Sequence, residues 1–421
     1  MIRQRWPSVA ARLEHEAPHQ LDAEVIEGHD QTLRIRGIQL TSRHDRLAEA
    51  RYQAASLPTA APELHVYGTG LGDLQRILLQ APTLQRLHVH VLNGAVFALA
   101  LGALDQLDWL GDPRVGLAYA GDTAEISLPF FALPSELALA DDQAAKIRDR
   151  LVSEVHLGFN NRIFEADDPA VIARLQSNEL LLAQDGDVAQ LFGSAPGAHV
   201  YIVATGPTLE RHYDHLRLSQ ATAERPLIIC VDTAYRPLLD HGIVADVVIA
   251  IDRHIRERHL PGEQSAGIPL VYLPMVAPQV LQQWHGPRLA AYSASPAYAP
   301  YRQRLPKGLL HSGGSVIHPA VDLAVRMGAV RVTLFGADFA FPYEKTHAGW
   351  DDGEFGSPAR LARYWVGDGH GGRVRTQLNL RGYLTELERY IAQHPEVAFF
   401  NSSRDGAFIA GTTFAEGLAH G

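Results

Sequence analysis

The sequence predicts an α/β protein with two Rossmann-like parallel-sheet domains, joined by a helical connector and preceded by a β-hairpin region. Three observations lead to this prediction. Apolar runs rich in β-branched residues alternate with amphipathic stretches over most of the chain, as in parallel sheets covered by helices. Residues 24–40 instead alternate apolar and polar side chains around a Gly-His-Asp turn, which is typical of a hairpin. At 421 residues, the chain is also too long for one typical domain.

The expected domain boundaries follow changes in this pattern. The hairpin region covers residues 1–60, the small Rossmann-like domain residues 61–141, and a more polar helical connector residues 142–195. The third region, residues 196–421, contains five nearly continuous apolar runs, each followed by a turn and a helical stretch. These runs are HVYIVA, PLIICV, DVVIAI, PLVYL and RVTLFG.

Composition limits the classes of partner. The chain has 37 Lys and Arg against 47 Asp and Glu, a net charge of −10, which argues against nucleic acid as a partner but allows an anionic sugar nucleotide. The amino-terminal stretch lacks a signal-peptide core, and the most apolar segment, residues 94–104, is too short to span a bilayer. We therefore expect a cytoplasmic protein without a membrane span. Cys230, the single cysteine, lies in an apolar run and is expected to be a buried, unreactive thiol.

Polar residues follow the apolar runs of the third region. One run ends in the turn Thr205 to Thr208, and three others end near Asp232, Asp252 and Asp338. The turn lacks the lysine of a P-loop and the later glycines of a dinucleotide fingerprint, yet its position between a strand and a helix suits a phosphate. An aspartate at such a place often caps a helix. Three of them at the edge where parallel sheets bind ligands indicate that at least one is functional.

A second glycine-bearing loop, Ser312-Gly313-Gly314-Ser315, precedes an apolar helical stripe that ends at Gly328. Its hydroxyl and N–H groups suit a phosphate or a nucleoside. Two such loops in one sheet, with acidic strand ends between them, predict a nucleotide pocket in which the loops face one another.

A third glycine-rich turn, Gly68-Thr69-Gly70-Leu71-Gly72, belongs to the small domain. Turns of this kind bind a dinucleotide or S-adenosylmethionine when an acidic residue at the end of the next strand takes the ribose hydroxyls. Here that strand ends in Asn93, which carries no charge. We therefore predict a turn whose glycines allow close packing, without useful affinity for either cofactor.

Four motifs in order carry a family resemblance: ATGPTL, VDTAYRPLLDHGIVADVVIAID, SGGSVIHPAVDLAVRMGAVRVTLFGADFAF with KTHAG, and VRTQLNL with FFNSSRDGAFIAG. They resemble the central domain of the motility-associated factor (Maf) family of flagellin glycosyltransferases, and GTGLGDLQRILL resembles that family's amino-terminal Rossmann-like domain. The resemblance implies transfer of a nonulosonic acid, of the pseudaminic or legionaminic type, from its CMP-sugar to Ser or Thr of flagellin. The central motifs also resemble bacterial CMP-sialic-acid sialyltransferases and an archaeal hydroxymethylpterin pyrophosphokinase family.

The sialyltransferase resemblance assigns nucleotide-binding positions. They are Gly206, Pro207 and Thr208; Asp232; Ser312, Gly313, Gly314 and Ser315; and Asp338 with Phe339. Two of these depart from the pattern, since Thr208 replaces a serine and Asp232 replaces an asparagine.

The reaction also needs a base and donors to phosphate. His347, on the loop after Asp338, is the expected base, with Asp252 as the next candidate, and Tyr343 and Lys345 are expected to donate to phosphate. No metal centre is predicted, because no zinc-ligand spacing is present. The sequence assigns no cofactor, the CMP-sugar donor is a substrate, and Mg²⁺ at Asp252 stays open as a candidate ion. Two alternatives stay open: a hydroxymethylpterin pyrophosphokinase-like diphosphotransferase, and a non-catalytic flagellin-binding protein.

Overall fold

The computed structural model describes residues 1–415 except 59, 124, 163–167 and 223. The chain divides into two compact units, Met1–His156 and Leu157–Gly421. The first unit holds both the predicted hairpin region and the predicted small domain. The division falls within the predicted connector, where helix α8 (Ala145–Arg162) crosses it. Residues 163–167 of that connector and 416–421 of the predicted third domain lie outside the described residues.

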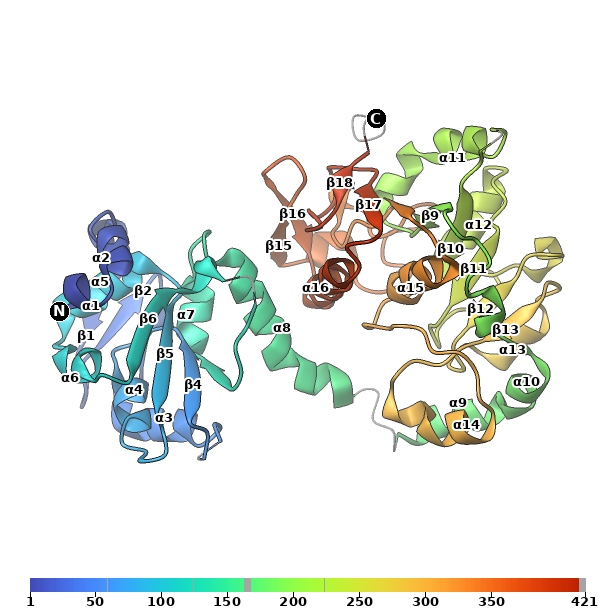
Figure 1. Cartoon of the computed structure of the whole chain (residues 1–421). Coiled ribbons are helices and arrows are strands. Elements are labelled where there is room, and N and C mark those ends of the chain that lie inside the picture. Colours follow the sequence, from blue (N-terminus) through green and yellow to red (C-terminus); the bar gives the residue numbers. More distant parts are fainter. Residues whose placement is uncertain (59, 124, 163–167, 223, 416–421) are drawn as a thin grey trace. The chain divides into compact units, whose positions relative to one another are not determined.

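The first unit begins with helices and a small antiparallel sheet (Figure 1). The sheet confirms the predicted hairpin, and its strands β1, β2 and β3 are paired in sequence order. The Asp45 carboxylate accepts a hydrogen bond from the Ala48 N–H and so caps the helix that follows. The elements are α1 (Ile2–Arg5), α2 (Pro7–Leu13), β1 (Ala23–Ile26), β2 (Thr32–Ile35), β3 (Ile38–Gln39) and α3 (Arg46–Ala54).

A four-stranded parallel sheet of order β6-β5-β4-β7 forms the centre of the first unit. Leu64, Val66 and Val89 point to one face, where they pack against apolar side chains of α2, α4, α5 and α6. Tyr67 belongs to the other face, where it packs with Ile147 of α8. The elements are β4 (Glu63–Tyr67), α4 (Asp73–Leu78), β5 (Arg86–Val91), α5 (Gly94–Ala103), α6 (Leu107–Gly111), β6 (Val115–Tyr119), β7 (Phe130–Ala132) and α7 (Pro134–Leu139).

The second unit contains a nine-stranded parallel sheet of order β18-β17-β14-β9-β10-β11-β12-β13-β8. All five predicted apolar runs form strands of this sheet, namely β9, β10, β11, β12 and β14. From β9 the chain adds β10 to β13 on one side, and β14, β17 and β18 on the other, so the strand order reverses at β9. The strands are β8 (Gly186–Asp187), β9 (His199–Val203), β10 (Leu227–Val231), β11 (Val247–Ala250), β12 (Leu270–Tyr272), β13 (Arg288–Ala290), β14 (Arg331–Phe335), β17 (Ala398–Asn401) and β18 (Thr413–Phe414).

Helices and one antiparallel strand pair complete the second unit. Helix α15 carries the predicted apolar stripe, packs on β9 and β10, and ends as predicted at Gly328, whose φ of 101° suits glycine. Cys230 is fully buried in β10, and burial raises the pKa of its thiol. The elements are α9 (Pro169–Ser177), α10 (Glu179–Gln184), α11 (Tyr213–Ser219), α12 (Asp232–Asp240), α13 (Pro278–Gln282), α14 (Ala299–Arg304), α15 (Ile317–Met327), α16 (Leu378–Gln393), β15 (Tyr364–Gly367) and β16 (Arg373–Thr376). Within the described ranges, no helix has both the length and the apolar character to cross a membrane.

Candidate functional site

The candidate site lies at the carboxyl edge of the nine-stranded sheet, beside β9, where the strand order reverses. Parallel sheets bind ligands at such switch points, because neighbouring loops leave the edge in opposite directions. The loops after β9, β10, β11 and β14 carry the predicted residues. Helix α15 leads directly into β14, so the loop before α15 also belongs to this edge.

The turn after β9 holds a carboxylate of the protein itself. The Thr208 N–H donates to Asp338 Oδ2 at 2.9 Å, and the Thr208 hydroxyl donates to Oδ1 at 2.5 Å. A Cβ on Gly206 would lie 2.5 Å from Asp338 Oδ2, so only glycine allows this approach. Burial raises the pKa of Asp338 to about 6, and the Thr208 hydrogen bonds partly oppose the rise. Two predicted site residues thus contact each other, and Asp338 fixes the shape of the turn.

We expect Thr208→Val to destabilise the protein by about 1–3 kcal/mol, because the buried Asp338 carboxyl loses a hydrogen-bond donor without a change in side-chain shape. Chemical denaturation measures this change. The control is Thr413→Val, at an exposed position of strand β18, which should lie within about 0.5 kcal/mol of the wild type. Equal stability of Thr208→Val and the control would contradict a structural role for the Thr208–Asp338 contact.

Asp232 is the first residue of α12 and is almost fully buried. Its Oδ1 accepts a hydrogen bond from the Thr233 N–H at 2.8 Å, whereas Oδ2 is buried and has no hydrogen-bond partner of ordinary geometry in the described part of the chain. Burial, and then the charge of Asp252, raise the pKa of Asp232 to about 7. The site therefore contains a buried carboxyl group with a raised pKa, and the backbone N–H groups of Ile251 and Asp252 lie near it without a hydrogen bond of ordinary geometry to Oδ2.

Asp252, after β11, is half-exposed and accepts hydrogen bonds from the backbone N–H and the ring Nδ1 of His254 at 2.8 and 2.9 Å. Its charge also helps to raise the pKa of Tyr383 on α16. Asp252 is therefore close enough to both Asp232 and Tyr383 for its charge to act on them, and its side chain is open to solvent.

The Ser312 to Ser315 loop is held against α16. A Cβ on Gly314, whose φ is 93°, would lie 2.7 Å from the Tyr383 ring. The Ser315 N–H donates to His318 Nδ1 at 3.2 Å, and His318 Nε2 lies 2.9 Å from the Tyr383 carbonyl oxygen. Tyr383 and His318 therefore position this loop. Sequence reasoning missed both. Only the fold brings Tyr383 to a loop about 70 residues earlier, whereas His318 lies three residues after Ser315 and its spacing could have indicated it.

The loop after β14 has left-handed backbone at three residues that are not glycine: Phe339, Tyr343 and Glu344, with φ of 46°, 57° and 54°. Such backbone costs on the order of 1–3 kcal/mol per residue and is concentrated at functional sites. The Thr376 hydroxyl donates to the Phe339 carbonyl oxygen at 2.6 Å and so fixes the first of these turns.

Tyr343 and Lys345 are both engaged by acidic side chains. The Tyr343 hydroxyl donates to Asp405, and the Lys345 ammonium group pairs with Glu210. A phosphate would have to replace these carboxylates before either predicted donor could bind it.

The segment around His347 folds back over the end of β9 and the start of α12. The Ala348 N–H donates to the Thr205 carbonyl oxygen at 2.8 Å, and the Trp350 indole N–H donates to the Thr233 carbonyl oxygen at 2.8 Å. The His347 ring packs edge-on against Phe355. Its Nδ1 is buried and, among the residues described, lacks a hydrogen-bond partner. Burial lowers the pKa of His347 to about 4, so the imidazole is neutral at pH 7 and retains an unused nitrogen.

In the first unit, a side chain of the protein occupies the glycine-rich turn. The buried Glu136 Oε1 accepts hydrogen bonds from the Thr69 N–H at 2.8 Å, the Thr69 hydroxyl at 3.2 Å and the Gly70 N–H. Asn93 caps α5 by accepting from the Val96 N–H. The N–H groups that would hold a phosphate therefore already hold a carboxylate.

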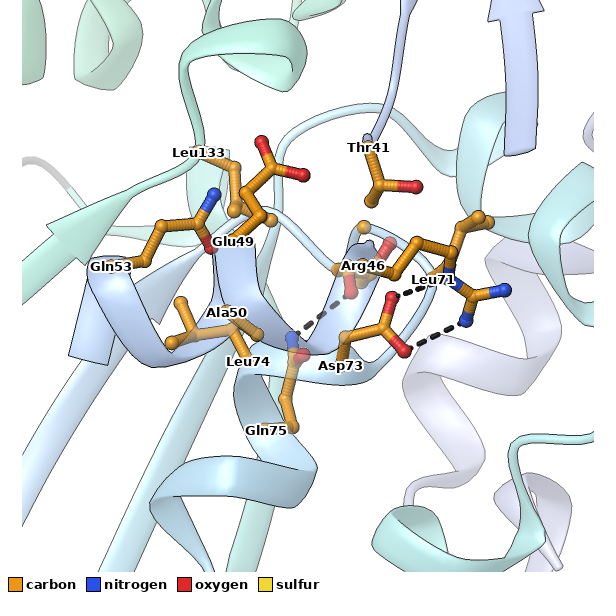
Figure 2. Close-up of a pocket in the computed structure, with 12 residues that line it drawn as sticks. Thr41, Arg46, Glu49, Ala50, Gln53, Leu71, Asp73, Leu74, Gln75 and Leu133 are labelled. Atoms are coloured by element: carbon orange, nitrogen blue, oxygen red, sulfur yellow. Dashed lines mark hydrogen bonds and ion pairs between the residues drawn. The ribbon is translucent and has the colours of Figure 1, made fainter. Parts of the chain in front are cut away.

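A small hollow beside this turn has room for about one water molecule (Figure 2). Figure 2 shows that Arg46 and Asp73 face each other there, joined by hydrogen bonds of 2.7 and 2.9 Å. The Arg46 guanidinium beside the turn is thus already paired within the protein.

We accordingly expect neither S-adenosylmethionine nor NAD to bind the first unit, because a ligand phosphate or carboxylate would have to expel Glu136. Isothermal titration calorimetry on the full chain measures this. Micromolar binding of either cofactor, lost on Arg46→Ala in the adjoining hollow, would overturn the expectation.

Residues 177–344 match the model of a family described as 6-hydroxymethylpterin diphosphokinase MptE-like. A solved structure of a Maf glycosyltransferase from Magnetospirillum magneticum AMB-1 is 19% identical, covers 99% of this chain and 73% of its own, and superimposes with a TM-score of 0.47. No curated protein matches the chain. The predicted resemblance is confirmed: the chain is similar to a Maf glycosyltransferase, and residues 177–344 are similar to the MptE-like family.

Proposed function

We propose that this protein is a glycosyltransferase that moves a nonulosonic acid, of the pseudaminic or legionaminic type, from its CMP-sugar to Ser or Thr of flagellin in the cytoplasm. The observation that carries the proposal is a pair of buried polar atoms at the switch point that have no hydrogen-bond partner of ordinary geometry among the described residues: Nδ1 of the neutral His347 and Oδ2 of Asp232. Buried polar atoms without partners are rare in folded proteins, and a bound ligand is one reason for them.

In this proposal the second unit binds the CMP-sugar at the carboxyl edge. Asp232 Oδ2 accepts a hydrogen bond from the nucleoside, and the Ser312 to Ser315 loop donates to the phosphate. The acceptor hydroxyl oxygen forms a bond to the anomeric carbon as the bond from that carbon to the phosphate oxygen breaks. The hydroxyl proton passes to His347 Nδ1, and CMP leaves with the bonding electron pair. The His347 segment covers the end of β9 and limits access of water to the activated sugar.

The test is a nucleotide comparison followed by complementation. CMP should stabilise the protein in a thermal-shift assay and ATP should not. A parallel arm with EDTA examines whether Mg²⁺ at Asp252 contributes. Deletion of the gene should remove the flagellin glycan, and the wild type but not His347→Ala should restore it. Stabilisation by ATP alone would overturn the proposal.

The MptE-like match favours a second candidate, a diphosphotransferase that uses ATP and a hydroxymethylpterin. Diphosphate transfer to a hydroxymethylpterin by the purified protein, which mass spectrometry detects, would support it. A third candidate is a non-catalytic flagellin-binding protein. Full restoration of the glycan by a double variant that lacks both candidate bases, His347→Ala with Asp252→Ala, with flagellin binding intact, would favour that candidate.

A further inference from the structure

A cluster of histidines lies in the first unit, on the face of the four-stranded sheet that carries Tyr67. Strands β4 and β5 are parallel neighbours, and their register places His65 opposite His88 and Tyr67 opposite His90. Alternate residues of a strand point to the same face, so Glu63, His65, His88 and His90 share it. Figure 1 shows the two strands side by side in the sheet.

Three of these side chains bring donor atoms together. One donor each from Glu63, His65 and His88 lie within 4.8 Å of one another. His88 Nε2 lies 2.5 Å from Glu63 Oε1, and the His65 and His88 rings stack with centroids 4.7 Å apart. Imidazole nitrogens and a carboxylate oxygen are the donor set that Zn²⁺ prefers when thiolates are absent.

His90 supplies the hydrogen-bond acceptor that fixes the orientation of the candidate metal-binding histidine His65. His65 Nδ1 lies 3.1 Å from His90 Nε2, which leaves His65 Nε2 for a metal. Histidines that bind metals usually donate the other ring N–H to a neighbouring acceptor, and this contact fixes both tautomer and orientation. His90 is itself buried and held in place by stacking on Tyr67 at 4.3 Å.

We propose that Glu63, His65 and His88 bind one Zn²⁺ ion, with His90 positioning His65. Three protein donors leave a fourth tetrahedral position for water. Glu63 and His88 are partly exposed, with 54% and 31% of their side chains accessible, so the ion enters from solvent. The ion would join the amino-terminal parts of β4 and β5. The zinc-ligand spacing is absent from the sequence because Glu63 and His88 lie 25 residues apart and only strand pairing unites them.

The test uses full-length, tag-free protein that has been treated with EDTA and dialysed. Zn²⁺ is titrated in competition with a chromophoric chelator, and bound zinc is measured by elemental analysis. The wild type should bind one equivalent and gain thermal stability. Glu63→Gln and His88→Ala should each weaken binding by at least about 10-fold. Both positions are partly exposed, so the variants keep the buried His65 and His90 in place.

The control is His44→Ala, an exposed histidine of the same unit, which should bind Zn²⁺ as the wild type does. Thermal midpoints of the metal-free variants, compared with the metal-free wild type, check that each has folded. Co²⁺ in place of Zn²⁺ should give the visible absorption of a tetrahedral site in the wild type and in His44→Ala only. Zinc binding equal in the wild type and Glu63→Gln, or no binding by the wild type, would overturn the proposal.

Discussion

His347→Ala is expected to lower sugar transfer by about 10²–10⁴-fold, the usual cost of a lost general base, while CMP binding stays close to that of the wild type. Two observations lead to this expectation. Hydrogen bonds from Ala348 and Trp350 hold the His347 segment over the end of β9, so the ring stays at the site. Its Nδ1 is also unused within the described residues, so a proton acceptor is available there.

The pH dependence of transfer provides a second measurement of the same role. Burial lowers the pKa of His347 to about 4, so the base is present over the whole neutral range. Protonation of His347 should therefore lower transfer by the wild type as the pH drops toward about 4, and the residual activity of His347→Ala should lack this part of the pH dependence. Titration of Asp232 near pH 7 should affect both proteins alike.

His285→Ala is the matched control, because His285 is exposed and precedes β13 at the amino edge of the sheet. It should transfer sugar at the wild-type rate. If His347→Ala also keeps nearly wild-type transfer, His347 is not the base, and Asp252 becomes the candidate.

The sequence was sufficient to predict the α/β class and the central strands, for a physical reason. Strands buried on both faces need continuous apolar runs, and β9, β10, β11, β12 and β14 all have them. In the hairpin of the first unit, β2 buries Leu33 and Ile35 and exposes Arg34 between them, as an alternating pattern predicts, whereas β1 is mostly exposed. Strands β8 and β13 have two and three residues, too few for either pattern to be detected.

The contacts of the candidate site could not be predicted in the same way. Residue types at strand ends indicate which side chains reach the edge, but they do not show which side chains pair there. Asp338 binds Thr208, 130 residues earlier in the chain, and Tyr343 binds Asp405. Glu136 enters the glycine-rich turn from 66 residues away. These pairings depend on tertiary packing that no local pattern records.

Asp232→Asn is expected to change the pH dependence of stability more than any other single substitution in the site. The folded-state pKa of Asp232 is raised from 3.8 to about 7, so the folded protein binds this proton more tightly than the unfolded chain does. Stability of the wild type therefore falls as the pH rises from about 4 to about 7, and stays lower above that range. A shift of this size corresponds to at most about 4 kcal/mol.

The neutral asparagine removes this pH-dependent cost, although its buried amide adds a constant penalty of about 1–3 kcal/mol for lack of a partner. The measured quantity is therefore the difference in unfolding free energy between variant and wild type at about pH 4 and about pH 8. From about pH 4 to about pH 8, the unfolding free energy of Asp232→Asn should rise relative to that of the wild type by up to about 4 kcal/mol. Asp240→Asn, half-exposed at the other end of α12, should move by less than about 0.5 kcal/mol. If the two variants respond to pH alike, Asp232 is already ionised in the folded protein, and its Oδ2 has a partner or solvent that stabilises the charge.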